Sequence, residues 1–206
     1  MASISSSGQI SVVNSEFCLA YPVDIIIKKK LFSLSKKKYA VTNADGDLFL
    51  NVTENFFGVH RRRYLSDTDG NTFLTLQECI MTMHSRWEVF MGDSTEDNNL
   101  LFSVKSHSMF QSNTEYDVFM ATNSEESGCC DFKIYENEIY AGNTKNNLIA
   151  QMNDQGSFMN TEYLVNVYPN VDLVFIVALV VIFEEIKHGG TSNSEGIFEL
   201  ANIVLS

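Results

Sequence analysis

The stretch "VDLVFIVALVVIFEEIKHGG", Val171 to Gly190, contains eleven consecutive apolar residues, from Leu173 to Phe183. With a rise of about 1.5 Å per residue, a helix over this run is roughly 16 Å long, about half of the ~30 Å hydrocarbon core of a bilayer. Asp172 directly precedes the run, and Glu184 and Glu185 directly follow it. Because each carboxylate would cost about 2.5–3.5 kcal/mol at bilayer depth, we expect the run to be buried in protein and not to span a membrane.

The residues that flank this run are typical of a helix. Pro169 can open a helix, Asn170 is a candidate N-cap, and the Asp172 carboxylate suits the positive end of the helix dipole. Lys187-His188-Gly189 supplies cationic residues and a glycine at the other end. These signals predict a helix over 170–187, although the β-branched residues of the run also fit a pair of buried strands. A helix without a polar stripe must be surrounded by protein on all sides.

Most of the remaining chain has the pattern of short antiparallel strands. Asp45-Gly46 and Asp69-Gly70 each adjoin a run of β-prone residues, which is a strong signal for a β-hairpin. Further short apolar runs follow, separated by loops rich in Asp, Asn, Ser and Gly. This spacing predicts a mainly β protein, a sandwich or a barrel, with no room for crossover helices. A closed sheet with the apolar helix through its middle is the arrangement that buries this helix on every side.

The composition is that of one globular domain. Of the 206 residues, 45% are hydrophobic and 19% are charged, and no stretch in the middle of the chain looks like a linker. We divide the chain into a disordered N-terminal tail at 1–15, a barrel domain at 16–188 that includes the helix, and a C-terminal tail at 189–206. The start, "MASISSSGQIS", lacks the basic and apolar regions of a secretory signal. We therefore expect a cytoplasmic protein, and a monomer.

Enzymatic and metal-dependent chemistry find no support in the sequence. It contains no HExxH, GxSxG, Walker A or GxGxxG motif. The four cysteines show no CxxC spacing, and we interpret them as reduced thiols without metal. A calcium loop around Gly70 fails, because Leu65 and Leu76 would occupy the positions that require Asp and Glu. We expect a protein that is not an enzyme, with no catalytic residues, no metal and no cofactor.

Three motifs connect the chain to a known family: "FGVHRRRYLSDTDGNTFLTLQ" (Phe57–Gln77), "MHSRWEVF" (Met83–Phe90) and "VNVYPNVDLVFIVALVVI" (Val165–Ile182). In this order they resemble the plant LURP-one-related family, and the likeness covers about Glu16 to Ile186. That family shares its fold with the tubby C-terminal domain and the phospholipid scramblases. The resemblance therefore implies a tubby-like closed antiparallel barrel of about twelve strands around a central hydrophobic C-terminal helix.

The resemblance also carries expectations about function. It implies a role in plant defence or stress signalling, and it points to lipid headgroups, because tubby domains bind phosphoinositides through Lys and Arg on the outside of the barrel. The multi-cysteine palmitoylation cluster and the acidic calcium segment of the scramblases are missing here, where the only adjacent cysteines are Cys129 and Cys130. The likeness is therefore to the fold and to a membrane-associated or signalling role, and not to a scramblase activity.

Positive charge is concentrated in the first third of the chain. The net charge is −12, but nine of the fourteen Lys and Arg form three triplets, at 28–30, 36–38 and 61–63. Alternate residues of a strand share a face, so each triplet presents its outer two residues together. If the triplets are adjacent, each charge adds about 1 kcal/mol of attraction to an anionic bilayer. The predicted lipid or phosphate contacts, on outward-facing side chains, are Lys28, Lys30, Lys36, Lys38, Arg61 and Arg63.

These observations predict a non-enzymatic module that binds anionic phospholipid headgroups, phosphoinositides among them, at the inner face of the plasma membrane. One alternative for the triplets is a solvated face that keeps strand edges from aggregating. Another is a protein–protein adaptor without lipid binding, whose acidic loops at Asp93–Asn99 and Asn123–Glu126 contact a basic partner. A third is a small-molecule binder with its pocket at the barrel mouth. Nucleic acid is disfavoured, because the residues after Arg63 carry a net charge of −16.

Overall fold

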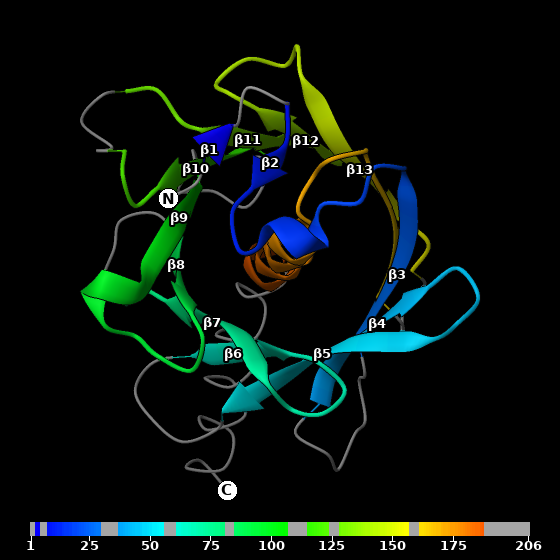
Figure 1. The fold of residues 1–206 in the computed structure, drawn as a ribbon. Coiled ribbons are helices and arrows are strands. Elements are labelled where there is room, and N and C mark those ends of the chain that lie inside the picture. Colours follow the sequence, from blue (N-terminus) through cyan, green and yellow to red (C-terminus); the bar gives the residue numbers. More distant parts are fainter. Residues whose placement is uncertain are drawn as a thin grey trace, which may run out of the picture.

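The computed structural model describes residues 3–4, 8–29, 37–55, 61–80, 85–106, 115–123, 128–156 and 161–187. Twelve antiparallel strands, each paired with its neighbours in sequence, form a barrel that closes between the last and the first of them (Figure 1). The barrel strands are β3 (Val23–Lys29), β4 (Lys37–Asn43), β5 (Leu48–Asn55), β6 (Arg62–Ser66), β7 (Thr72–Glu78), β8 (Arg86–Met91), β9 (Leu100–Ser106), β10 (Glu115–Met120), β11 (Phe132–Tyr135), β12 (Glu138–Ala141), β13 (Leu148–Asp154) and β14 (Glu162–Val167). The short strands β1 (Ser3–Ile4) and β2 (Ile10–Ser11) pair with each other outside the barrel, and η1 (Ser15–Phe17) and η2 (Asp97–Asn99) are 3-10 turns.

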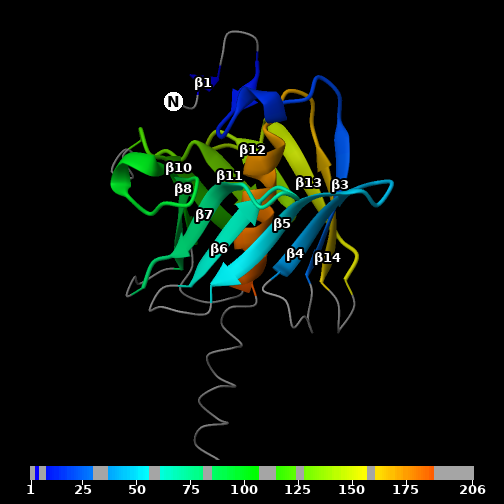
Figure 2. The same cartoon turned by 60° about the horizontal axis from the view of Figure 1, so that its bottom comes forward.

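The apolar run is a helix, residues 173–187, that passes through the middle of the barrel (Figures 1 and 2). Each side chain from Val174 to Phe183 is at most 1% exposed. The strands turn alternate apolar residues toward it, so that Phe175 packs edge-on against Phe102 with ring centroids 5.1 Å apart. The prediction of a closed antiparallel barrel of twelve strands around a hydrophobic C-terminal helix is confirmed, and the alternative of two buried strands is wrong.

The two Asp-Gly pairs lie in tight connections, as predicted. Asp45-Gly46 joins β4 to β5, and Asp69-Gly70 joins β6 to β7. Gly46 and Gly70 have φ angles of 90° and 93°, which side chains of L residues rarely tolerate. Both connections lie at the end of the barrel where the helix begins. We call this end the N-end and the end near residue 187 the C-end.

Asp172 closes the N-end by joining the helix to the N-terminal segment. It is fully buried, and its Oδ2 accepts hydrogen bonds from the backbone N–H groups of Val12, Val13 and Asn14 at 3.1, 2.7 and 3.1 Å. Its Oδ1 accepts from the N–H of Phe175 at 3.1 Å, which is an N-cap bond. This one carboxylate therefore satisfies four backbone donors from two parts of the chain.

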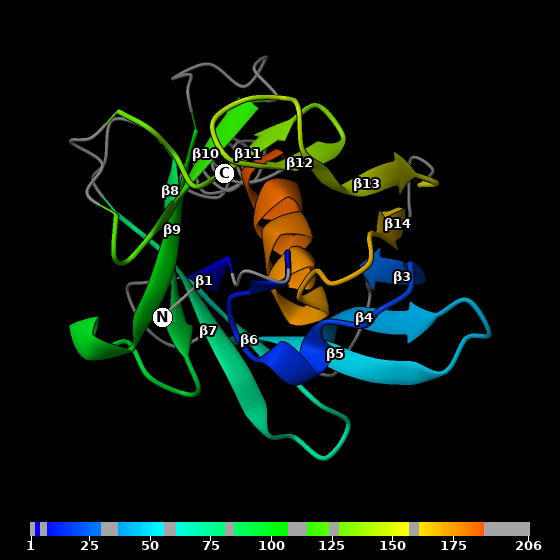
Figure 3. The ribbon, with the colours of Figure 1, turned by 45° about the horizontal axis from the view of Figure 1, so that its top comes forward.

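Two predictions at this end are corrected. The helix is capped by Asp172 and not by Asn170, because the first helical residue is 173 and Asn170 instead uses its backbone to bond Ile10 and Leu19. Residues 8–15, expected to be part of a disordered tail, lie across the N-end, as Figure 3 shows. Ile10 and Val12 each remain only 7% exposed and belong to the core. The predicted C-terminal tail lies outside the described residues.

Candidate functional site

The basic triplets meet at the C-end of the barrel. Lys28 and Lys29 end β3, and Lys38 is the second residue of the next strand, β4. Arg61 and Arg63 lie at the start of β6, which also runs from the C-end. Among the predicted lipid contacts, Lys30 and Lys36 lie outside the described residues. The described members lie at the same end of the barrel, and the direction in which their side chains point decides what they can bind.

Four cationic and phenolic side chains converge on the carboxylate of Glu185, at the last turn of the helix. Arg63 Nη2 lies 2.8 Å from Glu185 Oε2, and Lys38 Nζ lies 2.9 Å from Oε1. Tyr39 donates its hydroxyl to Oε1 at 2.5 Å, and Arg61 Nη2 lies 3.4 Å from Oε2. Arg63 is fully buried. The outward orientation predicted for Arg63 and Lys38 is wrong, because a buried glutamate at the end of the helix draws both side chains into the barrel.

Carboxylates on the strands complete this network. Glu54 lies 2.7 Å from Arg63 and 3.5 Å from Lys38, and Glu78 lies 3.3 Å from Arg61. Three positive side chains therefore face three negative ones, Glu54, Glu78 and Glu185. Burial alone would raise the pKa of Glu185, but the charges of Arg63 and Lys38 lower it to about 2. The network is electrically balanced, and it stabilises the helix end instead of presenting free cations.

Glu184 has a separate set of partners. It is 1% exposed, Lys29 Nζ lies 3.0 Å from its Oε1, and Tyr163 donates to Oε2 at 2.8 Å. Thr161 donates to Oε1 at 3.2 Å. Lys29, which the alternation argument left out of the predicted site, is thus the member of its triplet that turns inward, while Lys28 points outward with 52% of its side chain exposed and an ion pair to Glu162 at 3.2 Å.

The N-end has a different electrostatic character. Its described loops are 8–22, 44–47, 67–71, 92–99, 121–123, 128–131, 142–147 and 168–172, and together they contain ten acidic residues and one basic residue, Lys145. All ten except Asp172 are at least partly exposed, and within the described chain none of the nine forms an ion pair. The acidic residues are Glu16, Asp45, Asp47, Asp67, Asp69, Asp93, Glu96, Asp97, Asp131 and Asp172.

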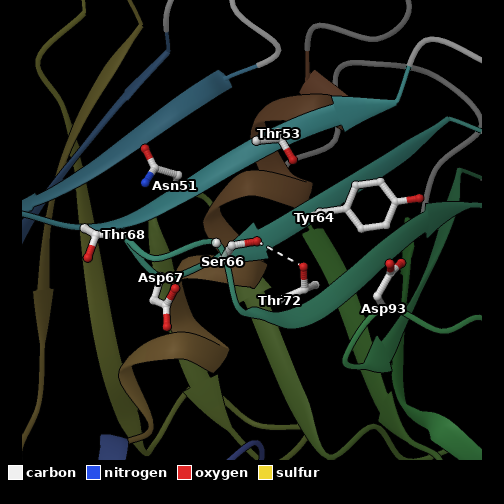
Figure 4. Close-up of a pocket in the computed structure, with 9 residues that line it drawn as sticks. Asn51, Thr53, Tyr64, Ser66, Asp67, Thr68, Thr72 and Asp93 are labelled. Carbon is white, nitrogen blue, oxygen red and sulfur yellow. Dashed lines mark hydrogen bonds between the residues drawn. The ribbon is translucent and has the colours of Figure 1, made fainter.

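A polar pocket of about 290 Å³ opens on the outer wall of the barrel, next to the N-end loops (Figure 4). Asn51 and Thr53 line it from β5, and Tyr64 and Ser66 line it from β6. The connection after β6 and Asp93 form its rim. The sequence analysis missed this pocket, because Asn51 and Ser66 become neighbours only through the pairing of β5 with β6.

Other kinds of site were sought throughout the described residues. No group of three or more His, Cys, Asp or Glu side chains there could hold a metal ion. The four cysteines, all within the described part, form no disulfide. No helix in the described ranges combines the length and the apolar character needed to cross a bilayer.

Comparisons with known proteins agree with this architecture. A family model described as LURP-one-related matches residues 23–184. The chain belongs to the LURP-one-related family. The matched range contains the barrel from β3 to β14, the outer-wall pocket and the helix as far as Glu184.

Two relatives and one solved structure of Arabidopsis thaliana proteins illustrate the relationship. The chain is 38% identical to Protein LURP-one-related 15 over 187 residues, which covers 85% of each chain. It is also 38% identical to Protein LURP1 over 190 residues, covering 87% of this chain and 91% of LURP1. An X-ray structure of an Arabidopsis thaliana protein matches with a TM-score of 0.66 and 33% identity, over 85% of this chain and 98% of that one. The resemblance to LURP-one-related proteins noted in the motifs is therefore confirmed.

Proposed function

We propose that this LURP-one-related protein is a non-enzymatic signalling module that docks a positively charged segment of a protein partner at the N-end of its barrel. The observation that carries the proposal is the charge of the N-end loops, whose described residues place nine at least partly exposed acidic side chains against one basic side chain, Lys145. A surface with charge of one sign attracts segments of opposite charge and speeds their association. On the family resemblance, we place this role in plant defence or stress signalling.

The scaffold favours binding through these loops. Loops that project from a rigid barrel can differ in sequence while their positions stay defined. The N-end is held together by Asp172, which bonds the helix to the N-terminal segment. The acidic loop at 93–99, already a candidate for a basic partner in the sequence, belongs to this surface. Negative charge from separate connections is thereby gathered on one end of the molecule.

A second candidate function is binding of anionic lipid headgroups at the C-end, as on the inner face of the plasma membrane. The observation that favours it is the convergence of the basic triplets on that end, with Lys28 52% exposed. Lys38, Arg61 and Arg63 are paired with glutamates inside the C-end network, so this candidate depends on Lys28, whose pair with Glu162 is exposed, together with Lys30 and Lys36. Fewer free cations give weaker attraction, since each contributes about 1 kcal/mol near an anionic surface.

One pair of assays separates the two functions. The purified protein is titrated with a fluorescent polylysine peptide, and it is co-sedimented with phosphatidylcholine vesicles with and without a phosphoinositide. We expect the peptide to bind, to bind more weakly as salt rises, and to lose affinity when Asp45, Asp69 and Asp97 are changed together to Asn. Lys28→Ala is the matched control and should bind the peptide normally. Sedimentation with phosphoinositide vesicles, without peptide binding, would replace the partner proposal with the lipid one.

A further inference from the structure

We propose that residues 8–19 form a displaceable strap. In the free protein the strap lies across the N-end of the barrel (Figure 3), and it gives way to a short cationic segment of the partner that carries two apolar residues at alternate positions. This role rests on the proposed function, because it names the chemistry of the segment that docks at the N-end and the contact that regulates docking.

The hydrogen bonds that hold the strap end at one place. Among the described residues, those that join the strap to the barrel and the helix all reach Asn170 or Asp172, in the connection between β14 and the helix. Ile10 donates to the Asn170 carbonyl at 2.8 Å and accepts from the Asp172 N–H at 2.9 Å. Leu19 accepts from the Asn170 N–H at 2.6 Å. As a strand, β2 pairs only with β1 in the described chain, so the strap can open without breaking a strand pair of the barrel.

Asp172 holds the strap through the strap backbone. Its Oδ2 accepts the N–H groups of three consecutive residues, Val12, Val13 and Asn14. Because every residue except proline carries such a donor, another segment without proline at these positions can offer the same three N–H groups. When one chain binds another in this way, the backbone gives affinity and alternate side chains give specificity.

Two side chains of the strap supply the apolar part of the contact. Ile10 and Val12 are each 7% exposed, and they share one buried cluster with Val171 and Val174 at the start of the helix. Ser11, which lies between them, is partly exposed. Because uncovering apolar surface is unfavourable, a segment that replaces the strap must bring two apolar side chains with the same spacing.

Charge is what a partner can offer and the strap lacks. The strap contains Glu16 and no Lys or Arg, and it lies among loops that are themselves acidic. It is tied to β3 through the exposed residues 20–22, and this covalent link keeps its local concentration at the N-end high. The link therefore favours the closed strap in the free protein. A segment with the same apolar pattern and several lysines gains an electrostatic attraction that the strap does not have.

The test is isothermal titration calorimetry of the full chain with two lysine-rich peptides of equal length and charge. One peptide has Ile and Val two positions apart in its middle, and the other has Ser at both positions. We expect the apolar peptide to bind more tightly. Ile10→Ala loosens the strap and should raise the affinity for the apolar peptide by about tenfold, because more of the protein is open, while the serine peptide is unaffected.

Ile134→Ala is the matched control, because it makes the same change in the barrel core on β11, outside the strap. It should lower stability without raising the affinity for either peptide. A rise in affinity of equal size in both variants would show a general loosening of the core and would overturn the strap.

Hydrogen exchange of the native chain gives a second reading that needs no variant. The amides of Val12, Val13 and Asn14 should exchange faster than that of Val104 in β9, since the strap opens locally while the barrel stays closed. The apolar peptide should speed their exchange further, and the serine peptide should not. Strap amides that exchange as slowly as that of Val104, with or without either peptide, would overturn the displaceable strap.

The strap and the docking surface fail in different ways. Equal binding of both peptides that ignores Ile10→Ala, but falls when Asp45, Asp69 and Asp97 are changed together to Asn, overturns the strap and leaves the proposed function standing. A preference for the apolar peptide that grows with Ile10→Ala and ignores the aspartate changes keeps the strap and removes the role of the acidic loops. Binding of neither peptide overturns both.

Discussion

Single buried carboxylates decide how both ends of the helix are held. Asp172 accepts hydrogen bonds from four backbone N–H groups at the N-end. At the C-end, Glu185 pairs with the cations of Lys38 and Arg63 and accepts a hydrogen bond from a tyrosine hydroxyl. Both are almost fully buried, 0% and 3% exposed. Such groups are tolerated in a core only when their lone pairs are used. Each can therefore be tested by a substitution that keeps its shape and changes its hydrogen bonding.

Asp172→Asn should lower the free energy of unfolding by about 2 kcal/mol or more, because the new amide NH₂ faces backbone N–H donors and leaves them unpaired. Urea unfolding followed by circular dichroism measures the change as a shift of the midpoint at constant m-value. Asp45→Asn, an exposed N-end position, is the control and should stay within about 0.5 kcal/mol of the native protein. Equal stability of the two variants would show that the Asp172 bonds do not hold the N-end.

Glu185 predicts a specific dependence of stability on pH. The pKa of the Glu185 carboxyl is about 2 in the folded protein, against an ordinary value of 4.5 that applies to the unfolded chain. As the pH falls, the unfolded chain therefore takes up the proton before the folded protein does. The stabilisation is complete above pH 4.5 and is lost as the pH falls toward 2, and it amounts to about 3 kcal/mol. Unfolding measured across this range should give a shallower pH dependence for Glu185→Gln, which should also be less stable at neutral pH. If the free energy of unfolding changed with pH in the same way for the native protein and for Glu185→Gln, the lowered pKa of Glu185 would be contradicted.

At the scale of the elements, the central helix is the core of the barrel. Phe175 packs against Phe102 at 5.1 Å and Phe132 at 4.8 Å, from strands on the surrounding wall. Phe175→Ala should cost about 3–5 kcal/mol, as is usual for a large aromatic lost from a core. Met91→Ala, at the end of β8 where the side chain is 38% exposed, should change stability little. Thermal unfolding that is equally affected by both changes would not fit a helix enclosed by strands.

The buried ion pairs of Arg63 at the C-end predict a second effect on stability. Arg63 lies in the network around Glu185 with no exposed surface, so Arg63→Ala removes one of the two cations nearest to the buried Glu185 carboxylate. Breaking a buried pair from one side costs about 3–5 kcal/mol. Lys28→Ala, in an exposed pair with Glu162, should cost less than about 1 kcal/mol. Denaturant midpoints that fall equally for both variants would argue against a structural role for the triplets.

The sequence was sufficient for features that depend on local pattern. An apolar run without a polar stripe has to be enclosed, and Asp-Gly pairs between β-prone runs mark hairpins, so both were predictable. The direction of Arg63 and Lys38 was not, because alternation says which residues share a face but not which face turns inward at a barrel end. Glu184 and Glu185 were the missed signal: two carboxylates that end a buried helix require cations nearby. The burial of Ile10 and the pocket at Asn51 depend on contacts between distant segments, which no local pattern contains.

Considered as a whole, the molecule separates its charge along the barrel axis. Its net charge of −12 is carried largely by exposed loops at the N-end. At the C-end, the triplet residues Lys28, Lys29, Lys38, Arg61 and Arg63 are each paired with a glutamate. The solved Arabidopsis thaliana structure that matches this chain shares its fold, and the loops are where a barrel of constant architecture can vary its partners. Finding where a cationic peptide binds on the molecule therefore tests this account more directly than measuring its affinity.

The most direct measurement is a map of chemical-shift changes in two-dimensional NMR spectra of the labelled protein during titration with a cationic peptide. The account predicts that the changes are concentrated in the N-end loops at 44–47, 67–71 and 92–99. Signals of the C-end network, such as those of Lys38 and Arg63, should remain in place. Shifts that gather at the C-end, or an absence of shifts at any peptide concentration, would contradict it.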